Sequence, residues 1–262
     1  MAYTTIDDPS AYFHTQLYVG NKNSANTITN DANAGNFQPD WLWIKSRDTS
    51  GGSGVNFVVD STRGNTKDLH TSNDEAEHTN SNMLASFDSD GFSIGTSASD
   101  NINKNGDNYV AWQWKANGGT TTSNGASGDI KASVTQREDT AKFSICTYTG
   151  TGINAGQSHR VNHGLGTTPH LMLFKSRGAS GDWVVYHHKN TASPETDYLV
   201  LNSTAATVDS ANKFNDTAPN TSYATIGGDD NISSGTMLLY SFAEVQGYSK
   251  FGSYTGNGNA DG

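Results

Sequence analysis

Only one cysteine occurs in the 262 residues of this chain, at position 146. An intrachain disulfide is therefore excluded, and so is a metal site built from several thiolates. Cys146 stands in the strand-like run Phe143–Tyr148. This position predicts a small strand residue, and a reactive thiol is the alternative reading.

Positive charge is also scarce. Sixteen Lys and Arg residues stand against 26 Asp and Glu residues, the formal net charge is −10, and the cations form no run. A protein that binds a phosphate backbone needs at least a local basic patch. We therefore expect no nucleic-acid partner.

Long apolar segments are missing, and Met1–Thr5 at the N-terminus is already polar. A membrane-spanning helix needs about 20 apolar residues, and a secretory leader needs an apolar stretch behind a basic start. We expect a protein that is made in the cytoplasm, enters no membrane and does not leave by the ordinary secretory route.

Good helix formers are rare, whereas the chain holds 28 glycines and many Asn, Ser and Thr residues. No segment keeps an apolar period of 3.6 over ten or more residues. Such usage favours short strands joined by tight polar turns. The sequence predicts an all-β fold of the sandwich or barrel kind.

What the chain does contain is a repeat. Pro39–Arg47 (PDWLWIKSR) returns as Pro169–Arg177 (PHLMLFKSR), 169 − 39 = 130 positions later. Neighbouring motifs recur in the same order: Phe13 with Phe143, Tyr18–Gly20 with Tyr148–Gly150, Val58-Val59 with Val184-Val185, Ser93–Gly95 with Thr225–Gly227, and Tyr109–Trp114 with Met237–Phe242. This self-similarity predicts two copies of one unit.

The repeat divides the chain into predicted segments. Two tandem homologous β-sandwich domains, jelly-roll or concanavalin-like, occupy residues 13–116 and 142–247. Residues 1–12 are an N-terminal arm, either a docking peptide or an untethered terminus. The Gly/Ser/Thr-rich residues 117–141 are a linker. Residues 248–262 repeat the Tyr148 motif around Tyr254, which predicts the start of a third repeat or a C-terminal strand.

Strand signals are clear in parts of the first copy. Trp41–Lys45 is apolar on both faces, which predicts a buried strand. Met83–Phe87 and Phe92–Gly95 flank the turn residues Asp88–Gly91, which predicts a hairpin. Residues 60–81 are polar and predicted to be irregular.

The closing strand of each copy alternates with a period of two. In Tyr109–Trp114 this period puts Val110, Trp112 and Trp114 on one face. The second copy keeps bulk and apolar character at the matching positions, which are Leu238, Tyr240 and Phe242. We expect this face to form a shared core layer.

Eight histidines raise the hypothesis of a metal site. His187 and His188 are adjacent, so on a strand they point to opposite faces and cannot share one ion. His159, His163 and His170 lie near each other but lack a metal-binding spacing. We interpret them as solvated loop histidines and predict no metal ligand in the chain.

Two acidic clusters, Asp88–Gly91 and Asp229–Asn231, could offer oxygens to calcium. The twelve-residue calcium loop with its terminal Glu is missing from both. A hairpin turn and a strand-connecting loop are the favoured interpretations.

Catalytic signatures are missing as well. No G-x-S-x-G elbow or Cys–His signature occurs, and Gly150–Gly156 has the wrong spacing for a phosphate loop. The E-x-D-x-E strand of sandwich glucanases is absent from around the five glutamates, Glu75, Glu77, Glu138, Glu195 and Glu244. We predict no catalytic or cofactor-binding residue, no cofactor and no enzyme activity.

Five tryptophans could stack on sugars, but each lies in a strand-like run, which favours core packing. They are Trp41, Trp43, Trp112, Trp114 and Trp183.

Four segments resemble a known family. They are Thr4–Phe13, Phe87–Phe92, Tyr109–Ala116 and Phe242–Phe251. Together they are similar to repeat-bearing virion proteins of tailed bacteriophages, especially marine ones, usually called tail fibre or structural proteins. The resemblance covers nearly the whole chain. It implies concanavalin-like sandwich repeats and no catalytic residues.

The resemblance implies a virion protein, a tail fibre or tail-associated adhesin used in particle assembly and host attachment. Such a chain is made in the bacterial host cytoplasm and resides in the virion. Expected partners are other virion proteins, its own copies in a homo-oligomer, and as an option a host surface glycan; many weak contacts would then add up. The alternatives are a head fibre or capsid decoration protein, and a carbohydrate-binding or carbohydrate-active sandwich protein.

Overall fold

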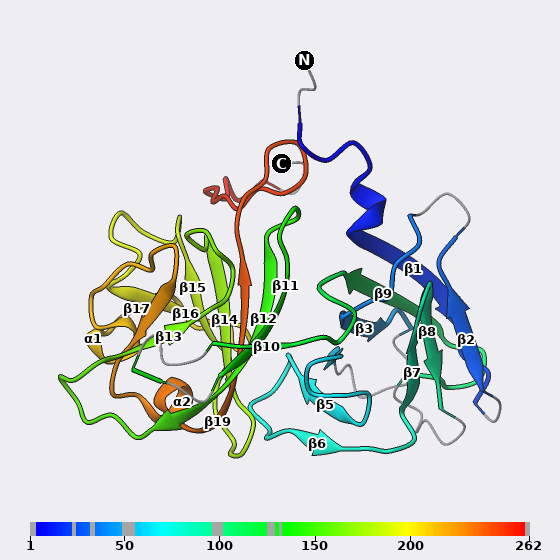
Figure 1. The fold of residues 1–262 in the computed structure, drawn as a ribbon, viewed down its shortest axis with the longest axis horizontal. Helices are drawn as coiled ribbons and strands as arrows, with labels where there is room; N and C mark the ends of the chain where they lie inside the picture. Colours follow the sequence, from blue (N-terminus) through cyan, green and yellow to red (C-terminus); the bar gives the residue numbers. More distant parts are fainter. Residues whose placement is uncertain are drawn as a thin grey trace.

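Strands make up almost all of the regular structure (Figure 1). The computed structural model describes residues 4–22, 25–31, 35–48, 56–95, 102–124, 129–130 and 133–259, and the fold is stated for these ranges. Their helices are short, namely η1 (Pro9–Ala11), α1 (Ala211–Phe214) and α2 (Asp230–Ser233). The all-β prediction is confirmed. None of these helices has the length and apolar composition needed to cross a membrane.

The first half of the chain forms a six-stranded antiparallel sheet in the order β1-β9-β3-β4-β5-β6. Its strands are β1 (Phe13–Val19), β9 (Asn108–Trp114), β3 (Trp41–Ser46), β4 (Asn56–Asp60), β5 (Lys67–His70) and β6 (His78–Thr79). The predicted buried strand is β3. The prediction that residues 60–81 are irregular is wrong, because this segment holds β5 and β6, and Leu69 at its centre is fully buried.

The second half forms an eight-stranded sheet in the order β10-β11-β12-β19-β14-β15-β16-β17. Its strands are β10 (Thr122–Ser123), β11 (Val134–Glu138), β12 (Phe143–Thr151), β19 (Ser234–Phe242), β14 (Leu171–Ser176), β15 (Val184–His187), β16 (Asp197–Val200) and β17 (Val208–Asp209). Residues 117–141, predicted as a linker, include β10 and β11. That prediction is wrong for these strands, because β11 pairs with β12 over its whole length.

A smaller layer covers the outer face of each large sheet. Strands β2 (Asn26–Thr29), β8 (Gly91–Ile94) and β7 (Leu84–Asp88) form a three-stranded sheet, and the predicted hairpin is confirmed as β7–β8. Strands β13 (His159–Asn162) and β18 (Tyr223–Ile226) pair on the other side, where α1 and α2 also pack. Each outer layer closes an apolar core, one around Phe92 and the other around Phe214.

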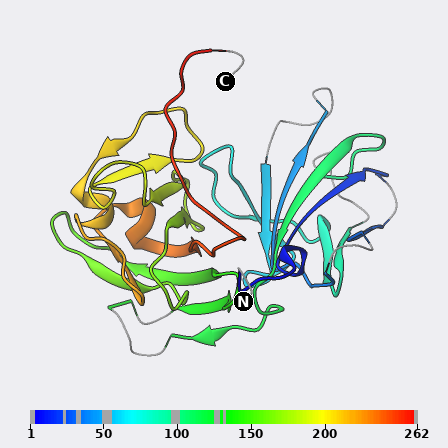
Figure 2. The ribbon, with the colours of Figure 1, turned by 90° about the horizontal axis from the view of Figure 1, so that it is seen from above.

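The two large sheets pack against each other through their remaining faces, so that the two halves lie side by side (Figures 1 and 2). Trp41 on β3 occupies the centre of this interface and is 1% exposed. Its ring centroid lies 4.4 Å from that of Trp114 and 4.5 Å from that of Tyr240. The contact therefore joins aromatic side chains from both sheets.

The face predicted as a shared core layer belongs mostly to this interface. Leu238, Tyr240 and Phe242 all lie in its buried cluster, and Trp114 packs against it. Trp112 lies beside the cluster, half-buried, with its ring 6.2 Å from that of Trp43.

Residues 130 positions apart in the two halves make matching contacts. Tyr18 Oη donates a hydrogen bond to Ile102 O at 2.8 Å, and Tyr148 Oη donates one to Ile232 O at 2.6 Å. In both cases the acceptor lies 84 positions further along the chain.

Glycine is needed at the same place in both halves. A Cβ atom on Gly20 would overlap the backbone of Lys104, and one on Gly150 would overlap the backbone of Ser233. A side chain at either position would force the two backbones apart.

The register of the paired strands corrects one pair of segments in the sequence repeat. Trp43 on β3 lies opposite Val58 on β4, whereas Leu173 on β14 lies opposite Val185 on β15. Trp43 and Leu173 are 130 positions apart, so Val58 corresponds to Val185. The match of Val58-Val59 with Val184-Val185 is therefore wrong by one residue, which on a strand exchanges the two faces.

The two terminal segments differ in how closely they pack on the rest of the chain, as far as the structure describes them. Ile6 in the N-terminal arm is 4% exposed, and Thr4 lies against Gly247, so residues 4–12 pack on the chain itself. Residues 250–259 contain no strand, and Tyr254 is 94% exposed. The predicted strand around Tyr254 is therefore wrong for these residues, while residues 1–3 and 260–262 lie outside the described ranges.

The matched tyrosines give a paired test. Tyr18→Phe and Tyr148→Phe should each lower the free energy of unfolding by about 1–2 kcal/mol, because each leaves a buried carbonyl without its donor. Urea unfolding at pH 7 measures both losses, with Tyr254→Phe as the exposed control that should change nothing. Equal stability of all three variants would contradict the assignment of these hydrogen bonds.

Candidate functional site

An apolar cavity of about 380 Å³ opens between the two large sheets. Aromatic and aliphatic side chains from both sheets form its wall, and the turn 248–251 forms part of its rim. The wall includes Phe13, Trp43, Trp114, Phe143, Leu171 and Phe242.

Three of the four segments that carry the family resemblance meet at this cavity, through Phe13 at the start of β1, Trp114 at the end of β9, and Phe242 and Phe251 at and after the end of β19. The ring of Phe13 lies 4.8 Å from that of Trp114. Phe242 lies 6.3 Å from Trp114 and 6.1 Å from Phe251, again between ring centroids. The fourth segment is the β7–β8 hairpin of the outer layer.

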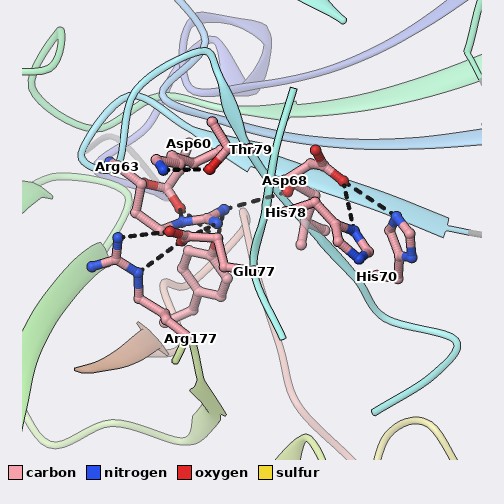
Figure 3. Close-up of polar contacts among 11 residues, drawn as sticks. Asp60, Arg63, Asp68, His70, Glu77, His78, Thr79 and Arg177 are labelled. Atoms are coloured by element: carbon pink, nitrogen blue, oxygen red, sulfur yellow. Dashed lines mark hydrogen bonds and ion pairs between the residues drawn. The ribbon is translucent and has the colours of Figure 1, made fainter. Parts of the chain in front are cut away.

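A buried ionic bridge crosses the interface beside the aromatic cluster (Figure 3). The guanidinium of Arg63, which is inaccessible to solvent, lies 2.5 Å from Asp60 Oδ2 and 3.0 Å from Glu77 Oε2. Tyr240, on the opposite sheet, accepts from Arg63 Nη2 and donates to Asp60 Oδ2. The bridge thus ties β4 and its following turn to β19.

Arg177 completes the bridge from the end of β14. Its Nε and Nη2 atoms donate to the two carboxylate oxygens of Glu77 at 2.7 and 2.9 Å, in the bidentate geometry that strengthens such pairs. Two carboxylates therefore face two guanidiniums, and no charge is left over. Burial alone would lower the pKa of Arg63, but the charges of Asp60 and Glu77 hold that pKa above its ordinary value.

Burial and neighbouring charges also oppose each other in setting the pKa of Glu77. Burial would raise its pKa, yet hydrogen bonds from Arg177 and the charge of Arg63 lower it. Glu77 therefore stays ionised in the interface.

A second polar cluster, centred on the carboxylate of Asp40, fixes the chain where it leaves the first sheet. Asp40 is fully buried and accepts hydrogen bonds from the backbone N–H groups of Ala116, Gly118 and Gly119 at 2.6–3.0 Å. Ser61 Oγ donates to it at 2.6 Å. The start of the 117–141 segment is thereby held against the six-stranded sheet.

A third polar cluster lies on the outer strands β5 and β6. Asp68 Oδ2 lies 3.2 Å from His70 Nε2 and 3.5 Å from His78 Nδ1. All three ligand atoms lie within 4.8 Å of one another, so these side chains could hold one metal ion. Neither histidine was among the metal candidates from sequence.

The histidines considered from sequence take other positions. His163, predicted to be solvated, is fully buried, and that prediction is wrong. Its Nδ1 accepts from Leu165 N at 3.1 Å and its Nε2 donates to Asn220 O at 3.0 Å. The ring of His170 lies 4.4 Å from that of His188, which lies 5.7 Å from that of His187. His159 forms a hydrogen bond with Thr151, so His159 and His163 do not join this group.

One aspartate of each acidic cluster has a protein partner. Ser86 Oγ and Ser93 Oγ donate to the two oxygens of Asp88 within the hairpin. Asp229, next to α2, lies 2.7 Å from Lys213 Nζ.

Cys146 lies in β12 and is fully buried, and burial raises the pKa of its thiol to about 12. Trp41 and Trp183 are buried as well, which agrees with core packing. Trp43 and Trp114 pack against the interface cluster and line the open cavity together with Trp41.

The sequence offers one signal for the residues that were missed. Asp68 and His70 are two positions apart, which on a strand puts both on one face, but the polar composition of residues 60–81 predicts an irregular segment. His78 joins them only through the β5–β6 pairing, in which it lies opposite Asp68. Arg63, Glu77 and Arg177 carry no local signal, because Glu77 and Arg177 are 100 positions apart.

The ionic bridge yields a stability prediction. Arg63→Met should lower the free energy of unfolding by about 3–5 kcal/mol, because it leaves the buried Asp60 carboxylate without its cation. Adding Asp60→Asn should recover part of the loss, since the uncompensated charge is then gone. Urea unfolding measures both variants. Arg160→Met, which breaks a solvent-exposed pair with Asp129, is the matched control and should cost far less.

If Arg63→Met lowered the free energy of unfolding by as little as Arg160→Met does, water would have to reach the ionic bridge, and its burial would be contradicted.

His163 yields a pH prediction. Burial lowers its pKa to about 4, from an ordinary value of 6.5. Between these values the unfolded chain binds the proton and the folded chain does not. The free energy of unfolding should therefore fall by up to about 3 kcal/mol as the pH drops from 6.5 to 4. His163→Gln should remove this part of the slope, and His159→Gln should keep it. Urea unfolding at several pH values measures this slope. The same slope of unfolding free energy against pH in His163→Gln and in the original chain would contradict the burial of a neutral imidazole.

Comparison with known proteins places the chain in one family. No curated protein matches it. No solved structure matches it either. The family described as a domain of unknown function (DUF7483) matches residues 8–262. That span contains both large sheets, the ionic bridge and the cavity, and the chain therefore belongs to this family of unknown function.

Proposed function

We propose that this chain is a structural protein of a tailed-bacteriophage particle, a tail fibre or tail-associated adhesin. Its two halves are copies of one sandwich unit, and their inner faces lock them into a single rigid body. The observation that carries the proposal is the face-to-face packing of the two large sheets around Trp41. The role is to build and to adhere, without turnover of a substrate.

Matching contacts support the common origin of the halves. Beyond the paired tyrosines and glycines, backbone hydrogen bonds recur at corresponding positions. Asp40 N donates to Trp114 O as His170 N donates to Phe242 O, both at 2.8 Å. Other matched pairs are Arg47 N to Asn108 O with Arg177 N to Thr236 O, and Gly95 N to Met83 O with Gly227 N to Lys213 O. Two unrelated sandwiches would have no reason to share these connections.

The interface has the properties of a fixed joint. Large aromatic side chains fill its core, and the ionic bridge inside it is neutral and hydrogen-bonded. Sliding one sheet over the other would expose Trp41 and separate Arg177 from Glu77. A stiff two-unit body suits a fibre or spacer, which has to keep its length and direction under load.

The proposed link to phage particles rests on the four segments that resemble virion proteins of tailed bacteriophages. Three of them meet at the cavity between the sheets, so they mark the joint of the body. The acidic surface, rich in Asn, Ser, Thr and Gly, fits a protein that works in many copies and relies on avidity. Its partners are then its own copies and other virion proteins.

Purified particles of a phage that encodes this chain provide the test. Mass spectrometry should detect the chain at several copies per particle, and gold-labelled antibodies against it should bind at the tail. Labelling of the head would favour the head fibre or decoration alternative. A chain that is made in infected cells but absent from purified particles would refute the proposal.

Glycan binding is a second candidate, favoured by Trp43 and Trp114, whose rings line the open cavity. A glycan array followed by a reducing-sugar assay separates the possibilities. Binding without turnover would support an adhesin, and turnover would show a carbohydrate-active enzyme. Trp43→Ala should abolish any binding at the cavity, with Trp112→Ala as the control outside its wall.

A further inference from the structure

We propose that Asp68, His70 and His78 form a site for one divalent transition-metal ion, of which Zn²⁺ is the best match. Asp68 and His70 are two positions apart on β5 and share a face, and His78 on β6 lies opposite Asp68 in the ladder. Figure 3 shows both imidazoles turned toward the Asp68 carboxylate. The hairpin geometry thus brings three potential ligands together from two strands.

The spacing suits a tetrahedral ion. Bonds of about 2.1 Å to nitrogen and oxygen place neighbouring ligand atoms of a tetrahedron about 3.4 Å apart. The carboxylate oxygen of Asp68 lies 3.2 Å from one imidazole nitrogen and 3.5 Å from the other. Two imidazoles and one carboxylate leave the fourth position for water.

Two buried polar atoms in the cluster form no hydrogen bond with the described part of the chain. Asp68 is 2% exposed, and within the described ranges its Oδ1 atom has no hydrogen-bond donor. His70 is 9% exposed, and its Nε2, although near the Asp68 carboxylate, forms no hydrogen bond with described atoms. Such groups are costly to bury, and a bound cation would offset that cost.

The surroundings orient His70 as in known metal sites. Glu75 Oε2 lies 2.9 Å from His70 Nδ1, and Asn73 Nδ2 donates to the same carboxylate at 2.7 Å. With its proton on Nδ1 and donated to Glu75, His70 presents the lone pair of Nε2 to the ion. A carboxylate behind the ligating imidazole is the usual second layer of a zinc site.

The choice of metal follows from the donors. Calcium and magnesium prefer sets made entirely of oxygen, whereas imidazole nitrogen suits zinc and its neighbours. His78 is half-exposed, so one side of the site is open to ions from solvent.

Binding would also stiffen the joint between the sheets. The segment between the ligands, residues 71–77, contacts the eight-stranded sheet through Asp74 O, which accepts from Lys175 Nζ at 3.2 Å, and through Glu77. A metal that clamps β5 to β6 holds both ends of this segment. The metal site is independent of the proposed virion role.

Isothermal titration of the full chain, first dialysed against a chelator, tests the site with Zn²⁺ alone. We expect one ion per chain and a rise in Tm of about 5–10 °C at a hundredfold excess over the dissociation constant. His78→Ala should weaken binding at least tenfold without unfolding the chain, since this side chain is half-exposed. His14→Ala, which removes an imidazole from β1, should bind like the original chain.

Co²⁺ provides a second readout, because a four-coordinate site gives it a strong visible absorption that His78→Ala should abolish. Calcium and magnesium should not compete. The proposal is refuted if no saturable zinc binding occurs, if His78→Ala binds as tightly as the original chain, or if calcium binds equally well.

Discussion

Both large sheets carry an apolar inner face, and neither face can remain in water. Across the contact, the ring centroid of Trp41 lies 5.7 Å from that of Phe143 and 4.5 Å from that of Tyr240, and Trp114 packs on Trp41 from the same sheet at 4.4 Å. Burying such side chains is worth about 1.5–3 kcal/mol each. If the sheets separated, that gain would be lost and a continuous aromatic surface exposed. The cavity and the ionic bridge lie between the two sheets, so their positions follow from this packing.

Polar groups inside the contact restrict how the sheets can meet. The bridge from Asp60 through Arg63 and Glu77 to Arg177 is neutral only in one relative orientation. Hydrophobic packing alone would tolerate small shifts, whereas a buried charge without a partner costs several kcal/mol. Asp40 adds a second restriction, because it binds the backbone where the chain crosses between the sheets. Apolar burial supplies the stability, and the buried ions select the geometry.

Local patterns predict much of this fold. Alternation in Tyr109–Trp114 identifies β9 and the face that it presents, and turn residues identify the β7–β8 hairpin. The prediction that the polar segment 60–81 is irregular fails because distant residues complete its surroundings: Trp183 Nε1 donates to His70 O at 2.7 Å across 113 positions. The same reason explains His163, whose burial depends on Asn220. The ionic bridge could not be predicted, because its residues meet only in the folded chain. Alternation can place Asp68 and His70 on one face, but His78 joins them only through the β5–β6 pairing.

The central claim is that the two halves form one body through their inner faces. Differential scanning calorimetry of the full chain tests it most directly, because units that fold independently melt independently. The structure predicts a single cooperative transition, with a calorimetric enthalpy equal to the van't Hoff enthalpy. Two resolved transitions, each with about half of the enthalpy, would contradict it.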